Sequence, residues 1–552
     1  MKNILFFLII LFGQTSAAQN LYLNITADTA HSSRVIDSIG YRTKHENTKS
    51  IVDEINAFSE KLSKMGYLEA ESGENKKTND STFTFSFRLG KKTKWLHLYT
   101  EKTSSLRTLA LFDKDTLIMP YSKAEIFLNQ TLGKLEKKGF ALAKLRLTHI
   151  TNKNTYLVAE LELVAENKRY LNGIIINGYD KFPEGHKYNI RRMYKNKIFN
   201  QDNLASIYND FGKFRFVKQV KYPEILFSKD STKIYVYVEK AKANSFDGYI
   251  GFSNNEEKKI IFNGYLDLTL NNILNTGETF TLYWKSDGEN QKTFNAAIEL
   301  PYIFKSPFGL KAQLNIFKQD STFQNTRTGI DLGYFFNYNT RLYLGYQATE
   351  SSDIQNLNTA SISDYKNSFI TSNFEFIDYK PDDFLFPEKT KINLKLGLGS
   401  RDSKRDSNSQ VFFNIDLKHN VYLNEKNSIN IKSQNHYLKS DVYIINELYR
   451  FGGINSIRGF NENSLQANLF SSLLTEYRYA LSPGIYTHSI IDYGYYQDKT
   501  TNNKGNLLGL GFGFGLLTKN GLFNIIYANG STNEQAIKLS NSIVHVSFKA
   551  VF

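Results

Sequence analysis

From Ser245 onward the chain consists of short segments in which apolar and polar residues alternate, separated by polar or Gly/Asn-rich turns. Alternation with a period of two is the pattern of β-strands, whose side chains point to opposite faces of a sheet. Sixteen such segments predict an all-β, 16-stranded transmembrane barrel over residues 245–552. Their expected centres are Ile250, Tyr265, Leu282, Ala297, Gln313, Gly329, Leu344, Phe374, Leu394, Phe413, Ile431, Leu473, Ser489, Gly511, Ile525 and Val546.

The connections between these segments differ in length. Every second one is compact, as at 275–277, 482–484 and 519–520, and the others are longer and polar, as at 350–366 and 497–504. Short turns at one end and long loops at the other are typical of outer-membrane barrels. A water-soluble β-sandwich is the alternative, and the even strand number and the last strand argue against it.

The last strand, residues 542–552, has one wholly apolar face. That face carries Val544, Val546, Phe548, Ala550 and Phe552, and the other carries His545, Ser547 and Lys549. A lipid-facing side of this kind is what closure of a membrane barrel requires.

Helical patterns occur only before residue 245, and there the sequence repeats. Similar signatures cover residues 62–70, 135–143 and 211–219, with 73 residues between Gly66 and Gly139 and 76 between Gly139 and Arg215. Each copy is predicted to end a helix at this Gly or Arg, with the next aromatic residue starting a strand. The period predicts α+β units of strand–helix–helix–strand–strand, and a single continuous α+β domain is the alternative.

The predicted organisation has five parts. A basic start, an apolar run over residues 4–12 and small residues at 16–18 indicate a signal peptide and export. The predicted parts are a signal peptide (1–18), three α+β domains (19–91, 92–166 and 167–244) and the barrel (245–552).

Composition narrows the function classes. The net charge is +14, but the basic residues are scattered, which argues against nucleic acid and favours attraction to acidic lipid headgroups or lipopolysaccharide. There is no cysteine, so disulfides, thiolate metal sites and a lipoprotein signal are excluded. G-x-S-x-G and H-E-x-x-H motifs are absent and the nine histidines are scattered, so we expect no catalytic site, no metal and no cofactor.

The most specific motif is Phe-Gly-Gly-Ile-Asn-Ser-Ile-Arg-Gly-Phe at 451–460, in the predicted sixth loop between the eleventh and twelfth strands. An arginine carried into a confined lumen needs carboxylate partners, and alternation from the lipid-facing Leu473 and Ile491 turns Glu476 and Asp492 inward. We therefore predict a lumen anchor for this loop, with an ordinary solvated arginine as the alternative. Its residues are Gly452, Gly453, Arg458, Gly459, Phe460, Glu476, Arg478, Asp492 and Gly494.

The fourteenth strand has glycine at every second position. Gly509, Gly511, Gly513 and Gly515 share one face, with Leu510, Phe512, Phe514 and Leu516 on the other. No helix follows, which excludes a phosphate loop. We expect the apolar residues to face lipid and the glycines to leave lumen space for the Arg458 loop.

These motifs resemble the BamA/TamA outer-membrane assembly superfamily. The Arg-Gly-Phe of the loop, Glu476 with Arg478, Asp492 with Gly494 and the terminal Phe552 match its signatures in order, and so do the turns 271–278 and 378–387. The repeats resemble its periplasmic POTRA domains, most clearly over residues 167–240, and the three-domain plan is most like TamA. The resemblance implies recognition of extended, β-rich clients by pairing with a sheet edge.

Two functions remain open. The first is assembly or insertion of outer-membrane proteins through a lateral seam between the first strand (246–253), which Gly248 and Gly251 should weaken, and the last strand, which carries Phe548 and Phe552. Its expected partners are unfolded or β-rich clients, outer-membrane lipid and a periplasm-spanning protein. The alternative is a two-partner secretion pore that exports one exoprotein; residues 19–25 read as a strand rather than a plug helix, which places it second.

Overall fold

The computed structural model describes residues 20–100, 114–153, 155–254, 260–287, 291–380, 383, 385–538 and 542–552. The chain divides into two units, residues 1–170 with 198–203 and residues 171–197 with 204–552. The predicted signal peptide, residues 1–18, lies outside the described residues. In the described part of the chain, no helix is long and apolar enough to cross a membrane.

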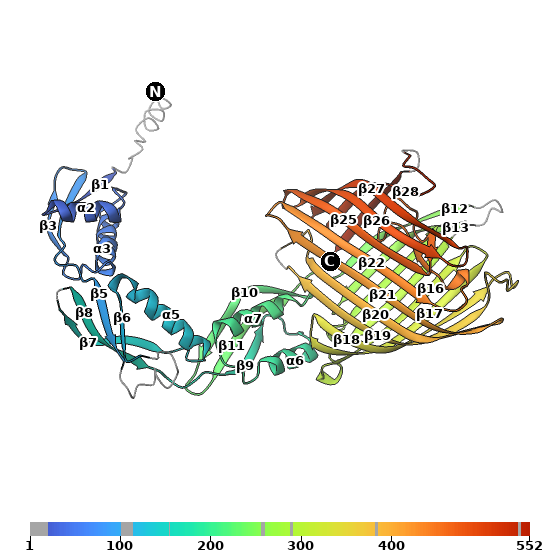
Figure 1. The fold of residues 1–552 in the computed structure, drawn as a ribbon, viewed down its shortest axis with the longest axis horizontal. Coiled ribbons are helices and arrows are strands. Elements are labelled where there is room, and N and C mark those ends of the chain that lie inside the picture. The colour runs from blue at the N-terminus through green and yellow to red at the C-terminus, as the bar shows by residue number, and fades with distance from the viewer. Residues whose placement is uncertain are drawn as a thin grey trace, which may run out of the picture. The chain divides into compact units, whose positions relative to one another are not determined.

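The first sheet has four strands in the order β2-β1-β4-β3 and packs against two helices (Figure 1). Its elements are β1 (Leu21–Ala27), α2 (Ala30–Ile39), β2 (Lys44–His45), α3 (Thr48–Lys64), β3 (Glu71–Lys77) and β4 (Thr82–Arg88). Helix α2 begins where the Thr29 hydroxyl accepts the Ser32 N–H at 3.1 Å. Ile36 of α2, Phe58 of α3 and Phe87 of β4 meet in one apolar core.

The second sheet has the order β6-β5-β8-β7. Its elements are β5 (Trp95–Tyr99), β6 (Thr116–Pro120), η1 (Tyr121–Lys123), α5 (Ala124–Lys137), β7 (Lys144–Asn152) and β8 (Tyr156–Val164). Its described residues contain one α-helix, α5, whereas the sequence predicts two, and residues 101–113 between β5 and β6 lie outside the described part.

The third domain follows the predicted order of strand, two helices and two strands. Its elements are β9 (Leu171–Asn177), α6 (Glu184–Tyr194), α7 (Gln201–Gly212), β10 (Val217–Phe227) and β11 (Thr232–Lys240), and the sheet order is β10-β11-β9. Here β9 pairs in parallel with β11, as β1 does with β4 and β5 with β8. In all three sheets the first strand is therefore parallel to the last.

The repeated signature marks a helix end followed by a turn. Gly66 and Gly139 follow α3 and α5 with φ of 102° and 96°, the left-handed backbone expected after a helix. The aromatic residue does not start a strand in these two copies, contrary to the prediction: the Tyr67 carbonyl accepts the Ala70 N–H in a turn, and β3 begins after it. Arg215 of the third copy has no left-handed backbone, because α7 has already ended.

Sixteen antiparallel strands form one closed barrel, as the sequence predicts, and each expected centre lies within one strand (Figure 1). The strands are β12 (Ser245–Asn254), β13 (Ile260–Asn271), β14 (Thr279–Asp287), β15 (Gln291–Leu300), β16 (Phe308–Gln319), β17 (Phe323–Asn337), β18 (Thr340–Asp353), β19 (Tyr365–Tyr379), β20 (Glu388–Ser403), β21 (Ser407–Tyr422), β22 (Asn427–Lys439), β25 (Leu469–Ser482), β26 (Ile485–Asp498), β27 (Asn503–Thr518), β28 (Gly521–Thr532) and β29 (Ile543–Val551).

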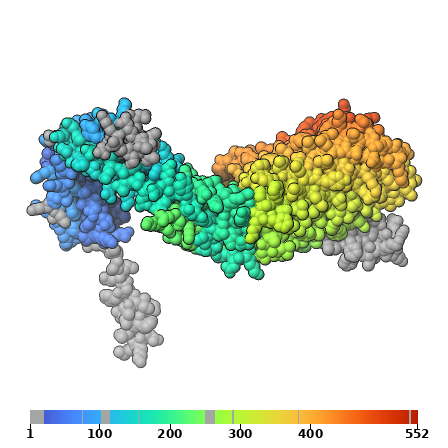
Figure 2. Space-filling view, turned by 90° about the horizontal axis from the view of Figure 1, so that it is seen from below, coloured from blue at the N-terminus to red at the C-terminus, as the bar shows by residue number. Residues whose placement is uncertain are grey.

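Alternation along these strands turns apolar side chains outward. Ile370 and Phe512 are 73% and 63% exposed, and Val544, Val546 and Phe548 of the last strand are exposed as predicted. Figure 2 shows part of this outer wall, where the colour changes gradually from yellow-green to orange because neighbouring strands are consecutive in the chain. An apolar exposed belt of this kind suits contact with lipid.

The predicted contrast between short turns and long loops is only partly right. We call the barrel end with residues 272–278 the turn end and the opposite end the loop end. At the loop end, β18 continues to Asp353 and β19 begins at Tyr365, so this loop is shorter than predicted. The polar Glu350 and Lys366 remain paired in the ladder, because backbone hydrogen bonding does not require apolar side chains. Residues 404–406 alone join β20 to β21 at this end.

The third domain packs on the turn end of the barrel through a buried histidine. His186 of α6 is fully buried, and its ring lies 5.2 Å from that of Phe214, 4.9 Å from Tyr302 and 5.4 Å from Tyr338. A Cβ at Gly277 would lie 2.0 Å from the ring, so the β13–β14 turn requires glycine there. Burial, together with the positive charge of the nearby Arg341, lowers the pKa of His186 to about 3.

Candidate functional site inside the barrel

The connection between β22 and β25, residues 440–468, folds into the barrel; we call it the lumen loop. It contains the short helix η3 (Ile445–Glu447) and a hairpin of β23 (Tyr449–Phe451) and β24 (Leu465–Ala467). An apolar cluster holds the hairpin against the inner faces of β25 and β27. The cluster consists of Phe451, Ile457, Ala467, Phe470, Leu474 and Leu507.

Arg458 at the tip of this loop lies between the two predicted carboxylates. Its Nε and NH2 donate to the two oxygens of Asp492 at 2.7 and 2.5 Å, and its NH1 donates to Glu476. The backbone N–H of Arg458 also donates to Asp492 at 3.0 Å. Asp492 is fully buried and Arg458 is 4% exposed. This bidentate, charge-assisted geometry fixes both the position and the orientation of the loop.

Arg478 extends the charge network along the wall of β25. It donates through Nε to Glu476 at 2.7 Å and through NH1 to Asn420 at 3.1 Å. Its guanidinium also lies 4.1 Å from the ring centre of Phe386, which comes from the β19–β20 turn. Glu476 thus lies between two arginines, so neither guanidinium is left without a counter-charge.

Glycines allow the loop tip to lie against the wall. A Cβ at Gly494 would lie 2.4 Å from the Ile457 side chain, and one at Gly509 would lie 2.3 Å from the Arg458 carbonyl oxygen. A Cβ at Gly459 would lie equally close, 2.3 Å, to the backbone nitrogen of Gly530 on β28. The contact of the loop with Gly530 was not predicted from the sequence, because a single glycine in a strand has many explanations.

Of the four alternating glycines in β27, only Gly509 receives the loop. A Cβ at Gly513 would meet the ring of His488 and one at Gly515 the ring of Tyr486, both from the neighbouring strand β26. Gly511 lies against the backbone of β28. The stripe therefore makes room mainly for aromatic side chains of the barrel wall, and the prediction that it houses the loop holds at one position.

The two arms of the loop run against each other near Gly452 and Gly453. These residues have φ of 106° and 96°, and a Cβ would lie 2.5 Å from the Asn461 carbonyl and 3.0 Å from Glu462, respectively. Phe460, next to the tip, packs against the apolar cluster. The glycine pair thus sets where the returning arm of the loop lies.

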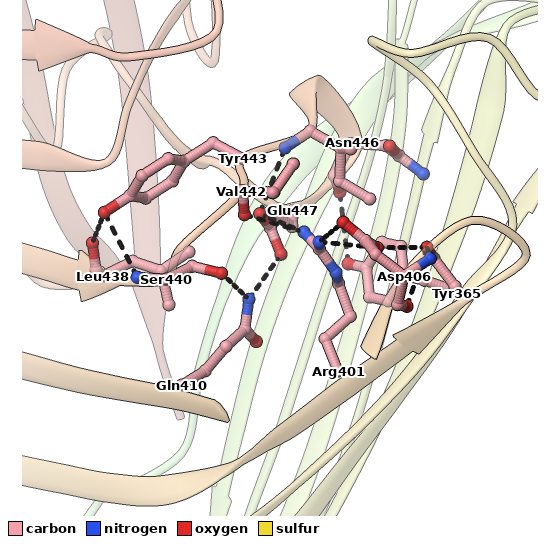
Figure 3. Close-up of polar contacts among 12 residues, drawn as sticks. Tyr365, Arg401, Asp406, Gln410, Leu438, Ser440, Val442, Tyr443, Asn446 and Glu447 are labelled. Carbon is pink, nitrogen blue, oxygen red and sulfur yellow. Dashed lines mark hydrogen bonds and ion pairs between the residues drawn. The ribbon is translucent and has the colours of Figure 1, made fainter. Parts of the chain in front are cut away.

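A second buried arginine fixes the first arm of the loop to the wall at β20 and β21 (Figure 3). Arg401 on β20 is fully buried; its NH1 donates to Glu447 of the loop at 2.6 Å and its NH2 to Asp406 at 3.0 and 3.1 Å. Gln410 on β21 donates to the other oxygen of Glu447 at 2.8 Å. This arrangement repeats the chemistry of Arg458 with the roles of loop and wall exchanged.

Asn446 adds an uncharged contact beside this arginine. Its side-chain amide nitrogen donates to Ser351 at 2.7 Å and to the Ser363 carbonyl at 2.8 Å, and the backbone carbonyl of Asn446 accepts from Asn325 and Tyr365. The first arm is therefore bonded to strands β17, β18 and β19 as well as to β20 and β21.

Sequence reasoning missed Arg401 and Glu447. Alternation from the lipid-facing Leu396 and Leu398 places Arg401 on the lumen side, so that half of the signal was present. Its partner is 46 residues away in an irregular loop, where no periodicity indicates the direction of a side chain.

The seam between the first and last strands is paired over a short length. Among the described residues, β12 and β29 have two partner pairs, Ser245 with Val551 and Phe246 with Ala550. Asn244 and Phe552 exchange two more backbone hydrogen bonds, of 3.2 and 3.0 Å. Every other neighbouring pair in the barrel has eight or more partner pairs.

The predicted seam residues lie at different levels. Gly248 and Gly251 lie on β12 beyond the paired residues, and both are in register with β13. A Cβ at Gly248 would lie 2.4 Å from the Tyr265 carbonyl. Phe548 is exposed on the outer face of β29, and Phe552 follows that strand at the paired end.

A cavity of about 420 Å³ lies beside Arg458, between the loop and the wall of β20–β22. Most of its lining is charged or amide, including Lys391, Lys418, Lys432 and Asp416. Among the described residues, no three His, Asp or Glu side chains gather where they could hold a metal ion. The arrangement is that of an electrostatic anchor beside a polar cavity.

The barrel matches the model of a known family and is similar in fold to solved structures. Residues 272–536 match the model of the Omp85 superfamily domain. The fold is similar to CdiB from Acinetobacter baumannii (12% identity, TM-score 0.52, covering 84% of this chain and 90% of that chain) and to CdiB from Escherichia coli (12% identity, TM-score 0.50, covering 91% and 98%).

The crystal structure of BamA from Haemophilus ducreyi lacking POTRA domains 1–3 also aligns, with 14% identity and a TM-score of 0.49, over 82% of this chain and 99% of that chain. The search of curated proteins finds no match to the sequence.

Proposed function

We propose, from the premise that residues 272–536 form an Omp85 superfamily domain, that this protein assembles, inserts or translocates β-rich polypeptides at the outer membrane. The barrel lies in that membrane, the turn end faces the periplasm together with the N-terminal domains, and the loop end faces outward. The observation that carries the proposal is the seam, which has two partner pairs where all other neighbouring strands have at least eight.

The seam supports a lateral mechanism. Beyond Phe246 and Ala550 the facing edges of β12 and β29 have no partner pairs in the described part of the chain. Unpaired backbone N–H and C=O groups on a strand edge form a template for another strand. An incoming client strand would pair there, and opening would cost little because few hydrogen bonds must break.

The lumen loop supports the same mechanism by its position. Arg458 is bonded to β25 and β26 and lies against β27, the strands that lead up to β29. We propose that Gly452, Gly453, Arg458, Gly459, Phe460, Glu476, Arg478, Asp492 and Gly494 act together as its anchor. The anchor holds the C-terminal strands in one arrangement while the seam opens and closes.

We propose that the N-terminal domains, over 19–91, 92–166 and 167–244, collect clients before they reach the barrel. Their sheets end in edge strands, such as β9 and β10 of the third domain, and edge strands suit pairing with extended segments. The basic net charge favours contact with anionic lipid or lipopolysaccharide, and an arm of this kind suits a periplasm-spanning partner. The proposed role is non-catalytic.

The experiment that tests this proposal is quantitative outer-membrane and secretome proteomics after depletion of the protein. Loss of several unrelated barrels or surface proteins is the expected result. An unchanged outer-membrane proteome would contradict the proposal.

A two-partner secretion pore is the second candidate, and the fold similarity to CdiB favours it. The described N-terminal segment begins with strand β1 rather than a helix that could plug the pore. Loss of one secreted protein with the barrels intact would establish this alternative instead.

A further inference from the structure

The lumen loop is bonded to strands on both sides of the seam. On the C-terminal side, Arg458 bonds to Glu476 on β25 and Asp492 on β26, and Gly459 lies against the backbone of β28. The loop thereby becomes part of the half of the barrel that ends at β29.

On the N-terminal side, the bonds close to the seam come from Glu462. One of its carboxylate oxygens accepts the Tyr283 hydroxyl at 2.8 Å and the other accepts Lys285 Nζ at 2.5 Å. Both partners are on β14, two strands beyond β12. Next to it, the Asn463 carbonyl accepts a long hydrogen bond of 3.4 Å from Gln291 on β15.

The segment from Arg458 to Asn463 therefore crosses the inside of the seam. It runs from β25–β28 past β29, β12 and β13 to β14 and β15. Its course is set locally: Gly453 packs on Glu462, and Asn463 has a left-handed φ of 55°. The two halves of the barrel, joined at the wall by few hydrogen bonds, are joined again in the lumen.

We infer that the lumen loop is a strap that holds the seam closed, and that Glu462 is the positioning residue that fastens it to β14. The inference rests on the proposed function, since it assigns the control of the seam through which a client would enter. Client entry then requires release of the strap as well as loss of the short strand pairing.

The two ends of the strap differ in how easily they can break. The side chains of Arg458 and Asp492 are 5% and 0% exposed, so separating them would leave buried charges unpaired. The side chains of Lys285 and Glu462 are 25% and 24% exposed, so water can replace their partner. Arg458 is therefore the permanent end and Glu462 the releasable end.

The absence of cysteine makes the strap directly testable, because a pair of introduced cysteines will be the only labelling sites. We would attach spin labels at Leu266→Cys on β13 and Val546→Cys on β29, in the full-length protein in lipid vesicles without a client. Double electron–electron resonance then measures the distance distribution across the seam. We expect one short, narrow distance in the otherwise unchanged protein.

Glu462→Lys should raise the population of long distances about two- to fivefold, the effect of losing one partly exposed ion pair. Adding Lys285→Glu, which restores the pair with its charges exchanged, should return the distribution to the short distance. The matched control is Asp441→Lys in the same loop, because Asp441 is exposed and has no ion pair among the described residues. If the lysine variant does not give a heat-modifiable barrel, Glu462→Gln, which keeps the side-chain size, takes its place in the distance measurement.

Unchanged distances in both Glu462 variants would overturn the strap, and so would a charge exchange that fails to close the seam. Equal opening in Asp441→Lys would also overturn it, because the effect would then follow the charge of the loop rather than this contact. Since no client is present, these results are independent of the proposed function. If depletion leaves the proteome unchanged while Glu462→Lys opens the seam, only the proposed function is contradicted. If depletion removes clients while Glu462→Lys leaves the seam distance unchanged, only the strap is contradicted.

Discussion

The two buried arginines of the lumen use the same chemistry in opposite directions. Arg458 is carried by the loop and finds its carboxylates on wall strands, whereas Arg401 is carried by the wall and finds Glu447 on the loop. Both are almost completely removed from solvent and both are bonded to two carboxylates. A guanidinium buried in this way is stable only with such partners, because desolvation of an unpaired charge is costly.

The two arginines differ in the strands that surround them, and this difference distinguishes a residue that only anchors the loop from one that also connects the loop to the seam. Arg401 lies in a continuous wall, where β19, β20 and β21 are paired over nearly their whole lengths. Arg458 lies among strands that lead to the weakly paired seam. The same ion-pair chemistry therefore stabilises the loop at both sites, but of the two arginines it is Arg458 that is bonded to strands leading to the seam whose opening we propose.

The largest effect on activity is expected from Arg458→Ala. Removing one partner of a buried pair costs about 3–5 kcal/mol locally, enough to release the loop tip while the barrel stays folded and heat-modifiable. Complementation of a depleted strain, read as the level of outer-membrane clients, should fall strongly. Complementation by Arg458→Lys should fall less, because lysine keeps the charge but loses the bidentate geometry. Normal complementation by the alanine variant would refute the anchor.

A smaller loss is expected from Gly509→Ala, which tests the packing of the same tip without removing a charge. The new Cβ would lie 2.3 Å from the Arg458 carbonyl, and displacement of the loop should cost about 1–3 kcal/mol. The level of complementation and the unfolding temperature should both decrease. Gly173→Ala in β9 is the control, since a Cβ there meets nothing within 4 Å; equal effects in the two variants would remove the support for close packing.

Arg401→Met should separate the two anchors. We expect greater hydrogen exchange in residues 440–448, because Glu447 loses its main partner, while the spin-label distance across the seam stays unchanged. Adding Glu447→Gln should recover part of the protection, since no unpaired buried charge remains. A shift in the seam distance in Arg401→Met would show that the two anchors are not independent.

The smallest effect at neutral pH concerns His186, a buried base without a carboxylate partner among the described residues. Burial lowers its folded pKa to about 3, below the ordinary value of 6.5, so the folded state holds it neutral. The neutral imidazole costs the folded state no stability above pH 6.5, where the unfolded chain also holds it neutral. As the pH drops from 6.5 toward 3, the unfolded chain binds a proton that the folded state does not, so the free energy of unfolding falls by about 1.4 kcal/mol per pH unit. Thermal unfolding of the full-length protein at pH 7.5 and 5.0 should show this slope, and His186→Leu should reduce it. An equal slope in both proteins would place the titration elsewhere.

Much of the barrel could be predicted because strand alternation is a local property. Each of the sixteen strands contains its expected centre, and counting alternate residues placed Glu476 and Asp492 inside. Strand ends were less predictable: Glu350 and Lys366 look like loop residues but remain in the ladder, since polar side chains do not interrupt backbone pairing. The aromatic residue after Gly66 was likewise taken for a strand start although a turn follows it.

The sequence by itself determined the barrel, its number of strands and the pairing of Arg458 with two inward carboxylates, because periodicity and charge balance act over short distances. Only the tertiary structure decided which distant segments meet: Arg401 with Glu447, His186 with the barrel turns, and Glu462 with β14. The short pairing of β12 with β29 is also tertiary, since both strands alternate like their neighbours and only closure of the barrel sets how far their edges meet.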